Sequence, residues 1–349
     1  MRFPLADWID AHAACRHDLA QSGMHGEIRV PVPSARAIRD SSESALRVRL
    51  ARRVGVHPSR LFLTHGATEG NALATLYLAR TVRGHGLRCR VEFPEYPPMF
   101  DVARWAGFRL VDGRAAADLA IVSQPRNPCG DLWPPDRLTS FADGAESIVV
   151  DETFREFTTA PSVQRLGLRT LWTTGSFTKV YGADAVRVGF VVVPEHERDA
   201  FARFHGLVTD EIAPFSVASA HAILDHRVGL LRTVRGVFRR NVRAWRRATP
   251  SSPPLSGPTA FDTSAGPDGE AFARRCLRAS VLAAPGSFFG RPDGVRVCLT
   301  RRTFPEDLVR YLEVRRGVGP VTHRASARAG SSSARRPPGS SALASAGRG

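Results

Sequence analysis

Position 179 holds the only lysine in this chain of 349 residues, since all the other residues counted as Lys plus Arg are arginines. An amine can lose its proton and attack a carbonyl, whereas a guanidinium stays protonated in proteins. Lys179 follows the small and apolar stretch 173–178, which carries no charge. A lysine left by chance in an arginine-biased chain would instead be expected on a charged helix face. The position therefore indicates Schiff-base chemistry.

A second sequence with a possible chemical role is the stretch 65–70, in which Gly66, Ala67 and Thr68 form a turn of small residues that opens a helix. Backbone amides at a helix start, with the helix dipole behind them, bind phosphate. An ordinary capped helix start would have the same sequence. The stretch is thus a candidate phosphate site, with simple capping as the alternative.

Three further polar residues stand where apolar runs end or begin. Asn127 lies between two prolines, which hold its side chain in a rigid turn, and a plain turn is an equal alternative. Asp151 follows the apolar run 148–150 directly, which places a carboxylate that needs a partner at the end of a strand. The ordinary alternative is that Asp151 caps a helix. Arg187 comes eight residues after Lys179, at the start of the next apolar run.

These residues must be positioned by the elements around them, and the chain predicts an α/β fold. Short apolar runs that resemble strands alternate with helical stretches, the pattern of a largely parallel sheet covered by helices. The expected strands are 61–64, 90–93, 119–122, 147–150, 170–173 and 188–193, and the expected helices are 69–83, 99–106, 195–204 and 216–248. Ligands of open α/β sheets bind outside the carboxyl ends of strands, so the candidate residues should gather there.

The composition fits a soluble globular α/β protein, with a hydrophobic share of 43%. The five cysteines are odd in number and lack close-pair spacing, which predicts free thiols in a reducing compartment and neither disulfides nor a metal site. The first residues contain no apolar signal core, and no run of about 18 apolar residues could span a membrane. We therefore expect a cytoplasmic location.

The formal net charge of +16 raises the question of nucleic acid. The arginines are spread along the chain, and part of the excess lies in the tail 317–349, so we do not expect nucleic acid as a partner. That tail has almost no large apolar side chains and is rich in Gly, Ser and Arg, which predicts disorder.

Five motifs, in this order along the chain, together resemble those of one known family. They are Asn127-Pro128-Cys129-Gly130, Asp151-Glu152 after a strand, Ser176-Phe177-Thr178-Lys179 followed by Arg187 and Gly189, Pro285-Gly286-Ser287-Phe288-Phe289-Gly290, and Arg296 within 295–297. The chain resembles the fold type I pyridoxal-phosphate enzymes from about residue 45 to 312, in particular class I/II aminotransferases of the aspartate and histidinol-phosphate kind. The resemblance implies pyridoxal 5'-phosphate as the cofactor.

The resemblance also implies roles for the residues that would hold the cofactor ring. Lys179 would form the internal aldimine and carry the proton from the substrate α-carbon. Asp151 would pair with the protonated pyridine nitrogen and keep the ring an electron sink. Asn127 would donate a hydrogen bond to the phenolate oxygen. Tyr96 falls where the family stacks an aromatic residue on the ring, although it could equally be a loop-packing aromatic.

The remaining roles concern the phosphate and the substrate. Ser176, Arg187 and the backbone of Gly66, Ala67 and Thr68 would hold the phosphate. Arg296, with Asn127 beside it, would bind the α-carboxylate of the amino acid through two parallel hydrogen bonds. An exposed strand arginine is the alternative for Arg296.

Three positions depart from the family pattern. Phe154 stands where the family usually has a tyrosine whose hydroxyl bonds the phenolate oxygen, and phenylalanine here resembles the threonine-phosphate decarboxylase branch. Ile38 stands about where a tyrosine often reaches the phosphate of the partner subunit. The link 111–118 is short, which predicts a trimmed cofactor domain.

The sequence thus predicts an aminotransferase that moves an amino group between an α-amino acid and a 2-oxo acid through the Lys179 aldimine. The alternatives are a decarboxylase, lyase or amino-acid oxidase of the same fold, or a basic binding protein without catalysis. We expect a homodimer, in which residues 45–230 form the large cofactor domain. Residues 1–44 and 231–316 would form a smaller domain, of which the C-terminal part is α+β.

Overall fold

The computed structural model describes residues 3–82, 84, 86–113, 115–250 and 252–317. Residues 318–349 of the tail that we expected to be disordered lie outside this part. Its largest sheet has seven strands in the order β2-β8-β7-β6-β5-β3-β4. In chain order these are β2 (Leu61–Thr64), β3 (Arg88–Val91), β4 (Arg109–Val111), β5 (Ala117–Ser123), β6 (Ala145–Asp151), β7 (Leu171–Ser176) and β8 (Gly189–Val192).

The strands β4, β3, β5, β6 and β7 are parallel, and β8 runs antiparallel to both of its neighbours. The register aligns the carboxyl ends of three strands, because Ser123 pairs with Asp151 and Asp151 pairs with Thr174. The reversed direction of β8 places its first residue, Gly189, between Ser176 and Thr64. The loops that we expected to carry chemistry therefore meet at one edge of the sheet.

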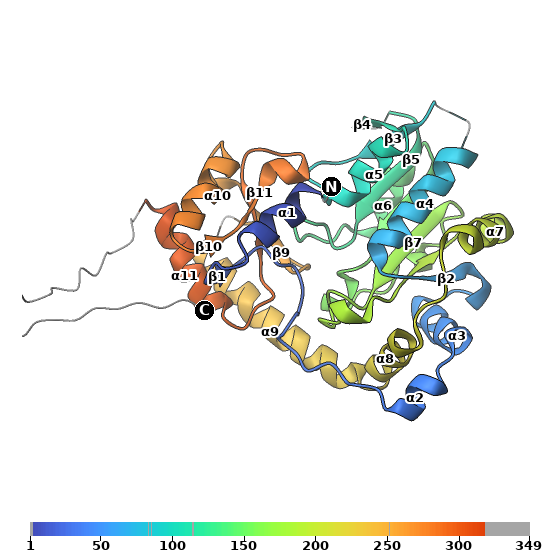
Figure 1. The fold of residues 1–349 in the computed structure, drawn as a ribbon. Helices are drawn as coiled ribbons and strands as arrows, with labels where there is room; N and C mark the ends of the chain where they lie inside the picture. The colour runs from blue at the N-terminus through green and yellow to red at the C-terminus, as the bar shows by residue number, and fades with distance from the viewer. Residues whose placement is uncertain (1–2, 83, 85, 114, 251, 318–349) are drawn as a thin grey trace, which may run out of the picture. The chain divides into compact units, whose positions relative to one another are not determined.

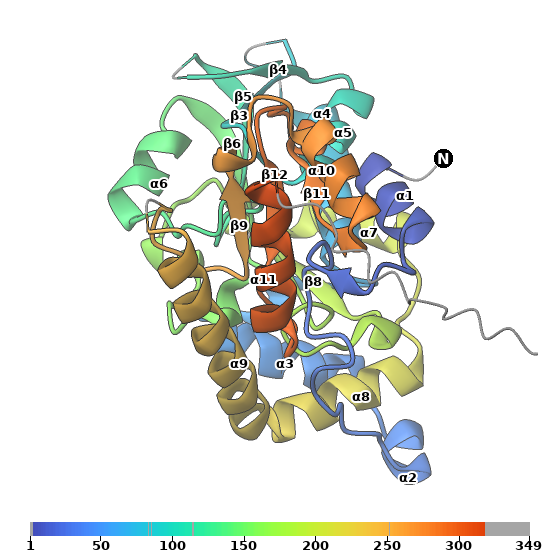
Figure 2. The same ribbon diagram turned by 90° about the vertical axis from the view of Figure 1, so that its left-hand side faces the viewer.

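Helices cover both faces of this sheet (Figure 1 and Figure 2). They are α3 (Glu43–Val54), α4 (Ala67–Thr81), α5 (Pro97–Trp105), α6 (Pro135–Ala142) and α7 (Arg198–Val208). Successive residues of β5 alternate between two apolar clusters, as the two-residue period of a strand requires. Leu119 packs with α4, α5 and α7 on one face, and Ala120 packs with α6 on the other.

The rest of the described chain builds a second group of elements beside this sheet. It holds a three-stranded antiparallel sheet of β11 (Ala284–Pro285), β12 (Val295–Cys298) and β9 (Thr259–Asp262), and a short parallel pair of β1 (His17–Asp18) and β10 (Val281–Leu282). The helices here are α1 (Pro4–Ala11), α2 (Ala35–Arg39), α8 (Pro214–Asp225), α9 (Arg227–Ala248), α10 (Gly269–Arg278) and α11 (Phe304–Arg315). Segments from both ends of the chain thus lie side by side (Figure 1).

The six expected strands and the first three expected helices are present, with ends shifted by a few residues. The expected helix 216–248 is wrong as one helix, because the chain bends at His226 and forms α8 and α9. Apolar residues continue across the bend, so the sequence pattern could not reveal it. The predicted domain boundary at 230/231 falls in the first turn of α9. Among the described residues, no helix is long and apolar enough to cross a membrane.

Candidate active site

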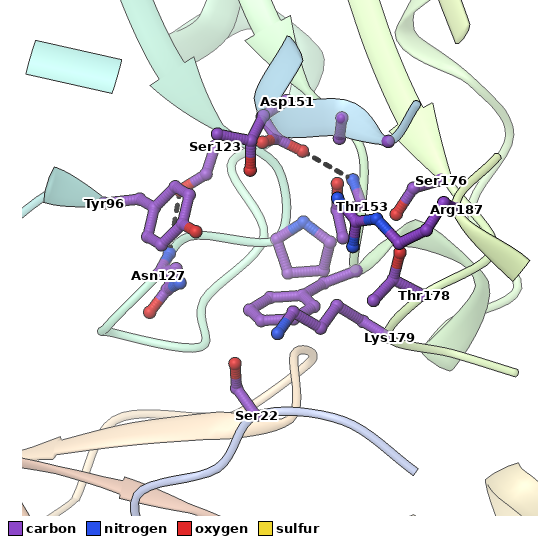
Figure 3. Close-up of a pocket in the computed structure, with 15 residues that line it drawn as sticks. Ser22, Tyr96, Ser123, Asn127, Asp151, Thr153, Ser176, Thr178, Lys179 and Arg187 are labelled. Atoms are coloured by element: carbon purple, nitrogen blue, oxygen red, sulfur yellow. Dashed lines mark hydrogen bonds between the residues drawn. The ribbon is translucent and has the colours of Figure 1, made fainter. Parts of the chain in front are cut away.

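A pocket opens at the edge of the large sheet where the strand ends meet (Figure 3). It encloses about 630 Å³ of empty space, including open solvent at its mouth. It is lined by Ser22, Gly66, Ala67, Thr68, Tyr96, Ser123, Pro125, Asn127, Asp151, Thr153, Phe154, Ser176, Thr178, Lys179 and Arg187. All nine residues that we expected to contact the cofactor are in this set, and Arg296 is not.

Lys179 follows β7 and extends its amine into the pocket (Figure 3). Its backbone carbonyl accepts a hydrogen bond from the N–H of Met24 over 2.9 Å, so the N-terminal segment packs against the lysine loop. Burial lowers the pKa of Lys179, and the positive charge of nearby Arg296 lowers it further. An amine in this setting loses its proton more readily than a lysine on the surface.

Asp151, at the end of β6, is 5% exposed and held by two hydrogen bonds. The side-chain amide of Asn71 donates to Oδ2 over 2.7 Å, and the N–H of Thr153 donates to Oδ1 over 2.8 Å. Asn71 is oriented in turn, because the hydroxyl of Thr174 donates to its Oδ1 over 2.6 Å. Burial raises the pKa of Asp151, while these bonds oppose the rise. A cationic partner in the pocket would favour its ionised form.

Asn127 and Tyr96 line another wall of the pocket (Figure 3). Asn127 is 5% exposed, and its backbone N–H donates to the Ser123 hydroxyl over 2.8 Å. Tyr96 precedes α5, and burial raises the pKa of its hydroxyl to about 12. Its ring meets Phe3 edge to face at 6.4 Å between centroids. Tyr96 therefore both packs against the chain and faces the pocket.

The opposite end of the pocket is more exposed and is formed by the start of α4, Ser176 and Arg187. The helix begins after Gly66 without a side-chain cap, which leaves its first N–H groups free for a ligand. Arg187 donates to the carbonyl of His65 over 2.9 Å. Gly189 allows β8 to lie this close to the start of α4, since a Cβ at position 189 would lie 2.5 Å from the carbonyl carbon of Gly66. The small residue of the Arg-x-Gly motif thus lets β8 approach the helix start.

Arg296 lies on β12 and is 1% exposed, which rules out the exposed strand arginine. Its guanidinium donates to Asn127 Oδ1 over 3.2 Å and to the carbonyl of Ala20 over 2.5 Å. Its Nε has no hydrogen-bond partner among the described residues. Arg296 therefore reaches the pocket through Asn127, with one donor free.

Sequence reasoning missed several residues of the site. Ser22, Thr153 and Thr178 line the pocket, and Asn71 holds Asp151 from helix α4. Asn71 gave a weak signal, since it is a polar residue one turn inside an apolar helix. Ser22 gave no signal in the sequence, because it comes from a segment distant from the other pocket residues. Phe154, at the expected tyrosine position, also lines the pocket. The described residues contain no group of three side chains able to hold a metal ion, and all five cysteines are free.

Comparison with known proteins identifies the family. The family model described as aminotransferase class I and II matches residues 39–310. This chain belongs to that family. It is accordingly a pyridoxal-phosphate-dependent transferase, and the resemblance drawn from the motifs is confirmed.

The chain is similar to two curated enzymes of different names. It is 28% identical over 289 residues to the histidinol-phosphate aminotransferase of Haloquadratum walsbyi, covering 75% of this chain and 74% of that protein. It is 26% identical over 350 residues to the capreomycidine synthase of Streptomyces vinaceus, covering 84% of this chain and 88% of that protein. In fold it is similar to the aspartate aminotransferase of Thermus thermophilus with maleate, with a TM-score of 0.74, 20% identity and coverage of 91% and 97%.

The pocket residues fit pyridoxal phosphate. The group needs an amine for covalent attachment, an acid opposite its ring nitrogen and donors for its phosphate. Lys179 is the only amine side chain in the sequence, and Asp151 is a buried carboxylate in the same pocket. Uncapped helix N–H groups and Arg187 stand at the exposed end. Each requirement thus has a matching donor or acceptor.

Proposed function

We propose that this enzyme moves an amino group between an α-amino acid and a 2-oxo acid, with Lys179 and Asp151 as its catalytic residues. The observation that carries the proposal is the position of the only lysine, in one pocket with Asp151 and Arg187. Pyridoxal phosphate, when bound, supplies an electron sink for the charge that develops on the substrate α-carbon.

In this proposal the cofactor ring would be held by Asp151, Asn127 and Tyr96. Its phosphate would be held by Ser176, Arg187 and the N–H groups at residues 66–68. The proposal is supported by the burial of the first group and by the free donors of the second. Charge-assisted hydrogen bonds from a guanidinium and from a helix start suit a phosphate dianion.

Lys179 Nζ would take the proton that leaves the substrate α-carbon and deliver it to the cofactor carbon that is bonded to the amino nitrogen. Its lowered pKa favours this role, because a general base must be unprotonated at working pH. Arg296, whose guanidinium contacts Asn127, orients the substrate by binding the α-carboxylate together with Asn127. A carboxylate held near the ring plane leaves the α-hydrogen perpendicular to the ring, which favours proton removal over decarboxylation.

The direct test is to load the protein with pyridoxal 5'-phosphate and follow its visible absorption. Reduction with borohydride should then fix the cofactor on the peptide that contains Lys179. A screen of amino donors should convert the chromophore and release an equal amount of 2-oxo acid. A protein that stays colourless with added cofactor would contradict the proposal and favour a binding protein without catalysis.

A second candidate is a lyase or related reaction of the same fold. It is favoured by the match to a synthase, which covers more of the chain than the match to the aminotransferase does. Phe154, which cannot donate a hydrogen bond, supports it further. The same incubations separate the candidates. Carbon dioxide without 2-oxo acid would indicate a decarboxylase, and 2-oxo acid formed only with dioxygen uptake would indicate an oxidase. Consumption of the amino acid with neither product, or 2-oxo acid released together with free ammonia and without dioxygen uptake, would indicate a lyase.

We further propose a cytoplasmic homodimer with the domain division given above. Exposed apolar side chains on three segments support association, since Val32, Leu207 and Val228 are 83%, 84% and 68% exposed. Five free thiols suit a reducing compartment. Light scattering of the purified protein tests the dimer, and limited proteolysis tests the domain division.

A further inference from the structure

A fully buried carboxylate lies behind the pocket wall that carries Tyr96 and Asn127. Glu95 is 0% exposed and does not line the pocket. None of the roles proposed above uses it. A buried charge is costly unless it is paired and hydrogen-bonded, so its partners indicate its function.

Three groups donate to this carboxylate, and they come from two loops that lie apart in sequence. The N–H of Tyr96 donates to Oε1 over 2.6 Å, and the Ser123 hydroxyl donates to the same oxygen over 2.5 Å. The N–H of Ser123 donates to Oε2 over 3.0 Å. Because Ser123 ends β5 and Tyr96 precedes α5, one side chain ties both loops together.

The Ser123 hydroxyl extends this connection to Asn127. Its hydrogen is directed at Glu95, so its lone pairs are free to accept the N–H of Asn127 over 2.8 Å. Asn127 is therefore bonded to Ser123, Ser123 to Glu95, and Glu95 to the backbone N–H of Tyr96. Hydrogen bonds linked in this way strengthen one another inside a protein.

The counter-charge of Glu95 comes from Arg126. The Nε of Arg126 lies 3.8 Å from Glu95 Oε2, and its Nη2 donates to the backbone carbonyls of Glu92 and Pro94 over 2.5 and 2.7 Å. Burial raises the pKa of Glu95, and Arg126 opposes the rise. The carboxylate thus accepts three hydrogen bonds and lies close to one positive charge.

We infer that Glu95 is a positioning residue, which fixes the Tyr96 ring relative to the Asn127 side chain by accepting hydrogen bonds from both loops. The inference rests on the proposed function, because those two side chains are the ones that we assign to the cofactor ring. Glu95 acts through them and touches no reacting atom.

Glu95→Gln tests the inference with little change in shape. An amide has one acceptor oxygen where the carboxylate has two, so its NH2 group must face a donor from Ser123 or Tyr96. We expect the dissociation constant of pyridoxal phosphate to rise about tenfold, since a buried donor is left unpaired. The visible circular dichroism of the bound cofactor should change, and kcat should fall more than KM rises.

Glu92→Gln is the matched control. Glu92 lies in the same loop and accepts from Arg126 and Arg137 over 3.1 and 2.6 Å, but it is half exposed, does not line the pocket and, within the described residues, accepts no hydrogen bond from Ser123 or Tyr96. Its variant should keep the cofactor affinity and the dichroic spectrum of the original chain. Equal losses in both variants would overturn the inference, because they would indicate a general effect on the loop.

Ser123→Ala provides a second variant in case Glu95→Gln does not fold. It removes the link to Asn127 and keeps the bond between Glu95 and Tyr96. We expect weaker cofactor binding and a changed spectrum, with the melting temperature of the cofactor-free protein lowered only slightly. Unchanged affinity and spectrum in this variant would overturn the inference. Failure of the original chain to bind the cofactor would instead contradict the proposed function.

Discussion

The two ends of the pocket differ in how their polar groups are satisfied. At the buried end, Asp151 and Asn127 are each 5% exposed and already hydrogen-bonded to Asn71 and Ser123. At the exposed end, α4 begins without a cap and Arg187 is open to solvent. A buried polar group without a partner is costly, whereas an exposed donor can bond to water until a ligand replaces it. The buried end is therefore prepared for one orientation, and the exposed end supplies affinity for an anion.

Lys179→Arg should have the largest effect, because it removes the amine that we propose to attach the cofactor and to move the proton. The guanidinium keeps the positive charge but cannot lose its proton at any pH where the protein folds. Turnover should fall to background, and borohydride should fix no cofactor. Reversible binding of pyridoxal phosphate, followed by its fluorescence, should persist through the exposed end. Measurable turnover in this variant would place the reacting amine outside the side chains of this protein.

Asp151→Asn should affect the rate more than the binding, since it belongs to the buried end. The neutral amide cannot stabilise a positive charge on the ring nitrogen. We expect turnover to fall about 10³-fold, which corresponds to ~4 kcal/mol of lost transition-state stabilisation. Steady-state kinetics at saturating cofactor measure this. A loss below about threefold would show that Asp151 does not face the ring.

The same variant gives a pH-dependent readout without cofactor. Burial raises the pKa of Asp151, so above about pH 4 the native state binds more protons at this site than the unfolded chain does. The contribution of this group to stability therefore decreases as pH rises. The melting temperature of Asp151→Asn, expressed as its difference from that of the original chain, should therefore increase from pH 4 to pH 7. A constant difference across this range would contradict the raised pKa.

Arg187→Ala should weaken binding more than it slows the reaction, since it belongs to the exposed end. Loss of charge-assisted hydrogen bonds should raise the dissociation constant of pyridoxal phosphate about 10- to 100-fold. At saturating cofactor, turnover should return close to the original value. Arg232→Ala, which removes an exposed arginine from α9, is the control and should change neither quantity. A lower turnover that excess cofactor does not restore would remove the distinction between the two ends.

Arg296→Lys should act on the amino acid alone. A single ammonium cannot reproduce the planar fork of a guanidinium, so KM for the amino donor should rise about tenfold. The dissociation constant of the cofactor should stay unchanged, because the proposal assigns Arg296 to the substrate carboxylate and to no atom of the cofactor. Titrations with both ligands measure the two constants. If cofactor binding weakens as much as substrate binding, Arg296 supports the pocket wall and not the substrate.

Phe154→Tyr should have the smallest effect. A tyrosine hydroxyl at this buried position would add a donor to the phenolate oxygen of the cofactor and favour its charged form. The spectral titration of the bound chromophore should shift to lower pH by about 0.4 to 1 unit, the equivalent of one net hydrogen bond. Turnover should change little. A shift to higher pH would mean that residue 154 does not face this oxygen.

Much of the site could be predicted from the sequence, because its residues stand in short motifs with their own chemistry. The positions of Asp151 and Lys179 after apolar runs placed them at strand ends, where the structure has them. The long apolar pattern at 216–248 was misread, because a bend at His226 leaves the spacing of apolar residues on either side intact.

The sequence by itself determined which side chains could react, the α/β class and the family, since these depend on residue type and local spacing. Only the tertiary structure decided which of them meet. The antiparallel direction of β8 brings Arg187 beside the start of α4, and the packing of β12 buries Arg296 against Asn127. The links from Glu95 to Ser123 likewise join the loop after β3 to the end of β5. Such contacts arise from the order and register of strands, which are set by packing between distant segments and leave no local pattern in the sequence.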